Sequence, residues 1–142
     1  MGGATAATAN NCAAELWNPA SAKSLYVREV WVFSTAATTM NLGIERSSAK
    51  GTTTVTVTPD ADNAFDRRAT PPSAATLELD FSAEPTMQGP YMIQACSAAV
   101  IGAGWVFVFP QAIEVPFGTG LVINTTQAAA FPVADVTFVW DE

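Results

Sequence analysis

The side chains with the greatest capacity for chemistry in this sequence are carboxylates, and they gather in two short segments. The first is Asp60-Ala-Asp62-Asn63-Ala-Phe-Asp66, whose closely spaced side-chain oxygens invite comparison with a calcium loop. However, the segment has no central glycine for the bend and no acid at the right distance after Asp66, and Arg67-Arg68 follows directly. We therefore expect a solvated loop with local Asp–Arg pairs and no metal site.

The second group is Glu78, Asp80 and Glu84, which invites comparison with the carboxylate pair of a glycosidase. Glu78 and Asp80 alternate along one expected strand, so their side chains lie about 7 Å apart on the same face. Any exposed strand face shows this spacing, which makes it unspecific. We expect a solvated outer face and no catalytic residues here.

The residue types that usually accompany catalysis are missing. The chain has no histidine, which removes the commonest general base, the Ser-His and Cys-His pairs and nearly all mixed zinc sites. Cys12 and Cys96 are too few for a four-thiolate metal site, and we expect two free thiols in a reducing compartment. The sequence thus predicts no enzyme, no cofactor and no bound metal.

Composition narrows the class of protein further. The 142 residues are 49% hydrophobic and 13% charged, with a formal net charge of −7, which argues against a nucleic-acid partner. No targeting signal is visible. Residues 91–109 are apolar and almost long enough to cross a membrane, but Gln94 and the Gly102-Ala-Gly104 break interrupt them. We expect two buried strands joined by a glycine turn, and no membrane contact.

Strand patterns dominate from residue 15 onward, and no segment reads as a helix. Residues 25–34 are rich in valine and aromatic residues and predict a central strand, whereas residues 53–58 alternate, with Val55 and Val57 facing inward. A hairpin turn is expected at 47–51. Further inward-facing sets are Leu77, Leu79 and Phe81, and Ala134, Val136, Phe138 and Trp140. A short strand is expected at 113–115, separate from one at 105–109.

About eight strands with unequal loops and turn residues every ten or so positions predict an all-β fold, an antiparallel β-sandwich. We favour a jelly roll over an immunoglobulin-like sandwich, because the Cys…Trp…Cys arrangement of the latter is missing. Residues 1–14 are rich in Ala, Thr, Gly and Asn, which predicts a flexible N-terminal arm ahead of a jelly-roll domain at 15–142.

Three segments together resemble small jelly-roll structural proteins of tailed bacteriophages. They are Glu15-Leu-Trp-Asn-Pro19 with the apolar strand after it, Val115-Pro-Phe-Gly-Thr-Gly-Leu121, and the closing Phe138-Val-Trp-Asp-Glu142. The resemblance implies a virion protein without catalysis, made in the host cytoplasm and placed on the capsid surface. Its best-fitting role is a capsid decoration (cement) protein that binds the major capsid protein across capsomers, commonly as a homotrimer.

The sequence also supports self-association without the resemblance. The mean hydropathy of +0.23 and the few charges are typical of a domain that buries apolar surface against copies of itself. The alternative function is a receptor- or glycan-binding domain of a phage fibre or tail, with Trp17, Phe65 or Phe117 as the aromatic platform for a sugar. A carboxylate hydrolase on a β-sandwich is the weakest alternative.

Overall fold

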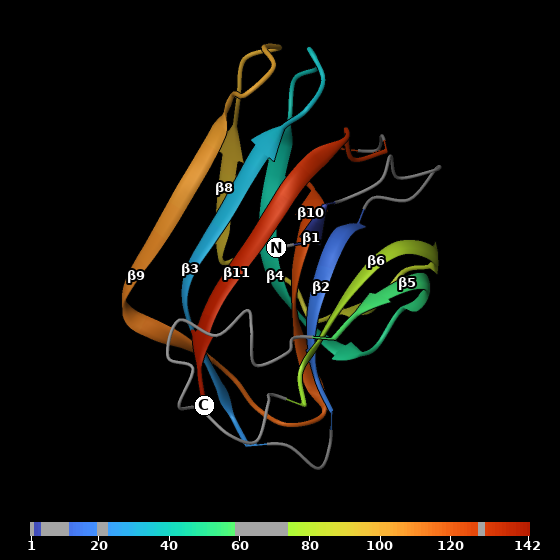
Figure 1. Cartoon of the computed structure of the whole chain (residues 1–142), viewed down its shortest axis with the longest axis vertical. Coiled ribbons are helices and arrows are strands. Elements are labelled where there is room, and N and C mark those ends of the chain that lie inside the picture. Colours follow the sequence, from blue (N-terminus) through green and yellow to red (C-terminus); the bar gives the residue numbers. More distant parts are fainter. Residues whose placement is uncertain (1, 4–11, 20–22, 59–73, 128–129) are drawn as a thin grey trace.

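The computed structural model describes residues 2–3, 12–19, 23–58, 74–127 and 130–142 of the chain. Within these residues the chain forms eleven strands and no helix, and eight of the strands have six residues or more (Figure 1). The strands are β1 (Gly2–Gly3), β2 (Cys12–Asn18), β3 (Leu25–Ser34), β4 (Asn41–Ala49), β5 (Thr52–Val57), β6 (Thr76–Ala83), β7 (Thr86–Met87), β8 (Ile93–Cys96), β9 (Gly104–Val115), β10 (Thr119–Thr125) and β11 (Ala134–Asp141).

The strands form two antiparallel sheets packed face to face, which confirms the predicted β-sandwich. Sheet A has the order β1-β11-β3-β9, and sheet B has the order β5-β6-β2-β10-β4-β7, with β8 also paired to β4. β3 pairs with β11 in sheet A, and their chain neighbours β4 and β10 pair with each other in sheet B. Two paired segments therefore cross together from one sheet to the other, as in a jelly roll.

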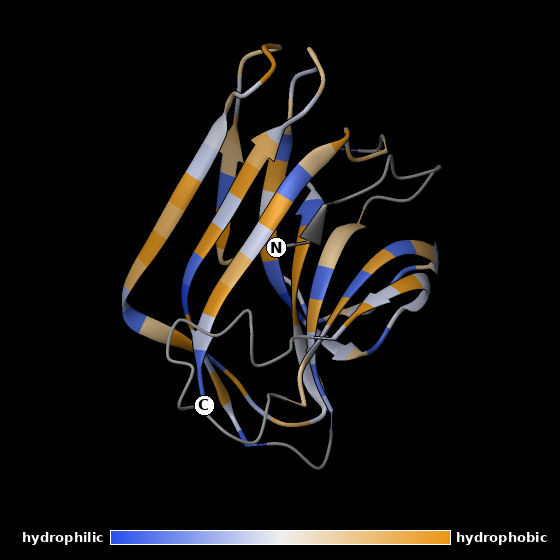
Figure 2. Cartoon of the chain, in the orientation of Figure 1, coloured by the Kyte–Doolittle hydropathy of each residue, from blue (hydrophilic) through white to orange (hydrophobic). Residues whose placement is uncertain are grey.

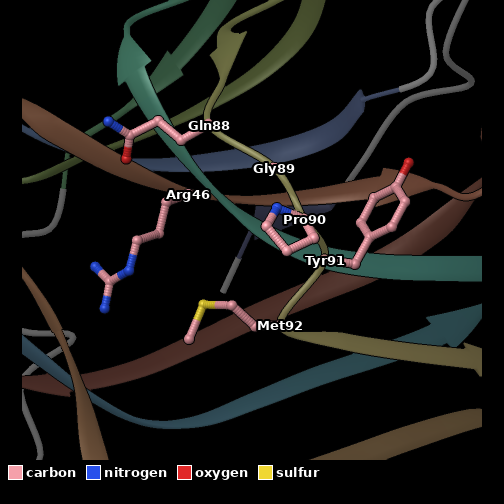
Figure 3. Close-up of a pocket in the computed structure, with 6 residues that line it drawn as sticks. All are labelled: Arg46, Gln88, Gly89, Pro90, Tyr91 and Met92. Carbon is pink, nitrogen blue, oxygen red and sulfur yellow. The ribbon is translucent and has the colours of Figure 1, made fainter.

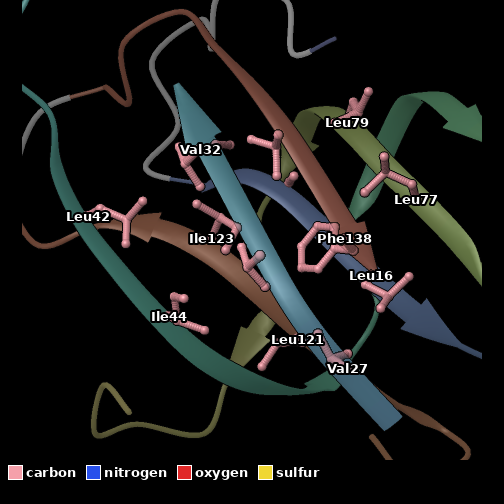
Figure 4. Close-up of a cluster of buried hydrophobic side chains, with 14 of the residues drawn as sticks. Leu16, Val27, Val32, Leu42, Ile44, Leu77, Leu79, Leu121, Ile123 and Phe138 are labelled. Carbon is pink, nitrogen blue, oxygen red and sulfur yellow. The ribbon is translucent and has the colours of Figure 1, made fainter. Parts of the chain in front are cut away.

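The main core lies between the sheets and follows from strand alternation. Figure 4 shows Val27, Val32 and Phe138 of sheet A directed toward leucines and isoleucines of sheet B. The predicted inward set on β11 is confirmed, since Ala134, Val136 and Phe138 are buried and Trp140 packs against the core. Each fully buried side chain of this size contributes about 1.5–3 kcal/mol to the free energy of unfolding.

The hairpin predicted at residues 47–51 is absent, because β4 runs on to Ala49 and does not pair with β5. Lys50 and Gly51 alone connect the two strands, although three other strands lie between them in sheet B. In a flat sheet β4 and β5 would be about 19 Å apart, whereas a two-residue link spans at most about 11 Å. Sheet B must therefore curl, and Figure 1 shows β5 and β6 bending back beside β2.

The curl encloses a second, smaller core of Cys12, Phe81 and Val122, with Met87 packed against it. Phe81 was predicted to share the main core with Leu77 and Leu79. It turns to the other side of β6 because Asp80 has a positive φ of 54°, which interrupts the alternation of the strand. On β5, Val57 packs inward as predicted, but Val55 is 37% exposed because β5 is the last strand of sheet B.

The strands expected within residues 91–109 are present but not fully buried. A turn containing Gly102, with φ of 81°, connects them, as predicted. However, β8 is an edge strand of sheet B and β9 an edge strand of sheet A, and the side chains of β8 and of β9 up to Phe109 are half-buried or exposed. The strand expected at 113–115 is continuous with β9, and residues 109–112 of β9 bulge opposite Arg28 alone.

The segment predicted as an N-terminal arm is partly placed in the sheets. Gly2 and Gly3 pair with Val136 and Asp135 of β11, and Cys12 to Ala14 belong to β2. Residues 4–11 lie outside the described residues. The described residues contain no helix that is long and apolar enough to cross a membrane.

Candidate assembly surface

One long stretch of the chain contains no charged residue. Between Glu84 and Glu114 the sequence contains no Asp, Glu, Lys or Arg, in a chain with 13 acidic and 6 basic residues. This stretch, residues 85–113, forms β7, β8, the loop after β8 and most of β9. We call it the charge-free side. Because β8 and β9 are edge strands of the two sheets and follow one another in the chain, these two strands lie along one flank of the molecule (Figure 1).

The charge-free side also holds most of the exposed apolar side chains. Of the nine large hydrophobic residues that are exposed in the described part of the chain, five belong to it: Met92, Val100, Ile101, Val106 and Val108. A sixth, Trp31 on β3, lies opposite Val106 in the sheet register. The Trp31 indole N–H donates to Glu29 Oε2 at 2.7 Å, so its polar atom is paired and its ring remains as apolar surface.

Strand β9 carries a run of apolar residues, seen as its orange and pale bands in Figure 2, and the burial pattern places them on both faces. Val106 and Val108 point outward and are 49% and 62% exposed. Trp105, Phe107 and Phe109 point inward and pack against the core, yet remain partly exposed, and the rings of Trp105 and Phe107 stack with centroids 6.3 Å apart. They stay partly open because, among the described residues, no strand pairs with the outer edge of β9.

A hollow of about 530 Å³ opens at the N-terminal end of the charge-free side, around residues 88–92 (Figure 3). Two of its polar side chains, Arg46 and Tyr91, already have structural partners. Arg46 donates to the Glu114 carbonyl at 2.5 Å, and the Tyr91 hydroxyl donates to the Thr125 carbonyl at 3.2 Å. Gln88, Gly89, Pro90 and Met92 complete the lining. The hollow therefore offers a recess on an apolar surface, and its lining has no acid–base pair.

The carboxylate group at Glu78 differs most from its prediction. Glu78 is fully buried, so the prediction of a solvated outer face was wrong. The curl of sheet B turns this face of β6 inward. Glu78 lies opposite Glu15 of β2 in the sheet register. Its Oε2 accepts a hydrogen bond from the Thr56 hydroxyl at 2.6 Å, and its Oε1 lies 2.6 Å from Lys50 Nζ. No face of this carboxyl is open to a sugar.

Glu15 and Glu45 are further buried acids, which sequence reasoning missed. Glu15 accepts hydrogen bonds from the Ser47 hydroxyl and from the Gly51 amide, the latter at 3.1 Å. Burial raises the pKa of the Glu15 carboxyl, and these two hydrogen bonds oppose the rise. Glu45 accepts from the Asn124 side-chain amide at 2.9 Å. These acids hold strands together in a closed interior, where no substrate reaches them.

The remaining candidates have structural places or lie outside the described residues. Asp60, Asp62, Asp66, the two arginines after them and Phe65 belong to the latter group. Among the described residues no cluster of three or more potential metal ligands occurs. Cys12 is buried, Cys96 is exposed and both are free, as predicted. Phe117 is 62% exposed on its turn, whereas Trp17 is half-buried.

Comparison of the chain with models of known protein families, with characterised proteins and with solved structures finds no match.

Proposed function

We propose that this protein is a structural component of a virion, a capsid decoration protein of a tailed bacteriophage that binds across capsomers as an oligomer. The observation that carries the proposal is the charge-free side, where exposed apolar side chains such as Ile101 and Val108 gather without any charge. Surfaces of this kind are typical of interfaces between proteins. The resemblance of the sequence to small phage jelly-roll proteins supplies the particular role, and the trimer as its usual form.

The demands of the role agree with these features. A decoration protein adds contacts between capsomers that resist the pressure of packaged DNA, and it needs no reacting group. Many copies on one shell make modest individual affinities sufficient. The net charge of −7 repels free nucleic acid and so favours contact with protein.

The test is binding of the purified chain to undecorated heads of the phage that encodes it. We expect saturable co-sedimentation with the heads and a higher temperature of head disruption. Ile101→Lys, at a 68% exposed tip of the charge-free side, should weaken binding, whereas Phe117→Lys, at a similarly exposed site elsewhere, should leave it unchanged. Heads that bind no protein would overturn the proposal.

The same two variants separate the alternative function. A fibre or tail domain that grips cell-surface sugars would bind a glycan array, and its binding would depend on an exposed aromatic ring. In that case Phe117→Lys would abolish binding and Ile101→Lys would not, which is the opposite of the pattern expected for decoration.

A further inference from the structure

In the described part of the chain no strand pairs with the outer edge of β9, and its outward backbone groups lie at defined positions. The Ser34 amide donates to the Ala103 carbonyl and the Gly102 amide donates to the Ser34 carbonyl, both at 2.8 Å. From there the register runs one to one, from Phe33 opposite Gly104 to Glu29 opposite Val108. Hydrogen-bonded and non-bonded pairs alternate along an antiparallel ladder. The backbone groups of Val106 and Val108 therefore point away from β3, toward the open edge.

From this geometry we infer that two copies of the chain pair through their β9 strands, antiparallel and across a two-fold axis near Phe107. In that register Val106 of each copy lies opposite Val108 of the other, and the two Phe107 residues face each other. The outward backbone groups of both valines are then satisfied by four new hydrogen bonds. The two copies of sheet A would join into one continuous sheet.

Charge identifies a second copy as the occupant of this edge. Every copy carries −7, so two copies approach without close like charges only along a neutral stretch. Residues 104–113 of β9 carry no charge, so the proposed register places no charged residue in the paired segment of either copy. Cross-strand pairs of aromatic and β-branched residues stabilise antiparallel strands, and this register forms only such pairs between residues 105 and 109.

The ends of the paired segment are also defined. Soluble proteins protect edge strands with charges, prolines or bulges. β9 uses proline and a bulge, but only from Phe109 and Pro110 onward. The residues from Gly104 to Val108 have no such protection in the described structure. The inference deepens the proposed function, because decoration as an oligomer requires self-association, and in that respect it rests on the proposed function. It favours a pair of chains, whereas the phage resemblance implies a trimer.

The first test is the mass of the assembly in solution at tens of micromolar protein, measured by light scattering or sedimentation. We expect twice the chain mass of 14.9 kDa. Val108→Lys places a charge on the seam and should weaken association by about tenfold or more. Val55→Lys is the matched control, because Val55 is an exposed valine on β5, the edge strand of sheet B, and this variant should remain paired.

The second test is amide hydrogen exchange, which reports on backbone pairing directly. The amides of Val106 and Val108 should be protected in concentrated protein and exchange fast on dilution, in the unmodified chain. A monomer or an odd-numbered assembly, equal effects of the two lysine variants, or fast exchange at all concentrations would overturn the inference. A monomer that still binds phage heads would refute the pairing and the oligomeric part of the proposed function, and would leave head binding intact. A pair that binds no heads would refute the proposed function and leave the pairing intact.

Discussion

Lys50 and Glu78 form an ion pair that joins the surface to the interior. The Lys50 side chain is 38% exposed, the Glu78 carboxylate is fully buried, and their charged atoms lie 2.6 Å apart. Lys50 belongs to the two-residue link that forces sheet B to curl, and Glu78 belongs to the strand face that the curl encloses. The pair thus lies where β4, at one side of the sheet, meets β6 near the other.

Removing the lysine should leave a buried carboxylate without its counter-charge. We expect Lys50→Met to lower the free energy of unfolding by about 1–3 kcal/mol, at the lower end of buried pairs because water still reaches the lysine. Urea denaturation at neutral pH measures the change. The double variant with Glu78→Gln should recover part of the loss, and a double-mutant cycle gives the coupling. Equal stability of Lys50→Met and the unmodified chain would contradict this role.

Glu15 should make stability depend on pH. Its folded-state pKa is raised, chiefly by burial and further by the charge of Glu78, while Ser47, Gly51 and Lys50 oppose the rise. The folded state therefore holds the proton more tightly than the unfolded state, and stability falls as pH rises from the ordinary glutamate range through the raised folded value. Over that pH interval the free energy of unfolding of the unmodified chain should fall relative to that of Glu15→Gln, which has no carboxyl to titrate at this position. Denaturation curves at several pH values check the difference, and parallel pH profiles would show that Glu15 contributes none of it.

Burial was predicted correctly from the sequence in strands where each face has the same environment along its whole length. On β11, alternation alone assigns Val136 and Phe138 to the core, because sheet A has one packed face. Alternation placed Glu78 on the face of β6 opposite Leu77 and Leu79, but it could not show that sheet B curls and buries that face as well. That curl depends on which strands pair, and pairing between strands distant in sequence leaves no local signal. The charge-free side could have been found in the sequence as a long gap between charged residues.

Gly104 marks the start of β9 and has no room for a side chain. A Cβ there would overlap the Val32 carbonyl oxygen and would lie 2.7 Å from the Phe33 Cα. These are backbone atoms of the neighbouring strand, so they cannot rotate away. We expect Gly104→Ala to lower the free energy of unfolding by about 1–3 kcal/mol, since overpacking forces backbone shifts.

Gly102 provides the comparison for this effect. It lies two residues earlier, and a Cβ there would meet no atom within 4 Å, although its φ of 81° itself disfavours alanine. Gly102→Ala should therefore cost about 1 kcal/mol through conformation alone. Thermal or chemical denaturation of both variants separates the two causes. If Gly102→Ala lowered the free energy of unfolding more than Gly104→Ala, close packing of β9 on β3 would not be the reason that residue 104 is glycine.

The two cysteines should differ sharply in reactivity. Burial raises the pKa of the Cys12 thiol, and the negative charge of Glu15 raises it further, so little thiolate forms at neutral pH. Cys96 is exposed on β8. In dilute folded protein, a maleimide reagent should therefore modify one thiol per chain quickly, and Cys96→Ser should abolish that reaction. After unfolding in urea the unmodified chain should react at both positions. Fast labelling of Cys12 in the folded Cys96→Ser variant would mean that the second core opens readily, contrary to its close packing with Phe81 and Val122.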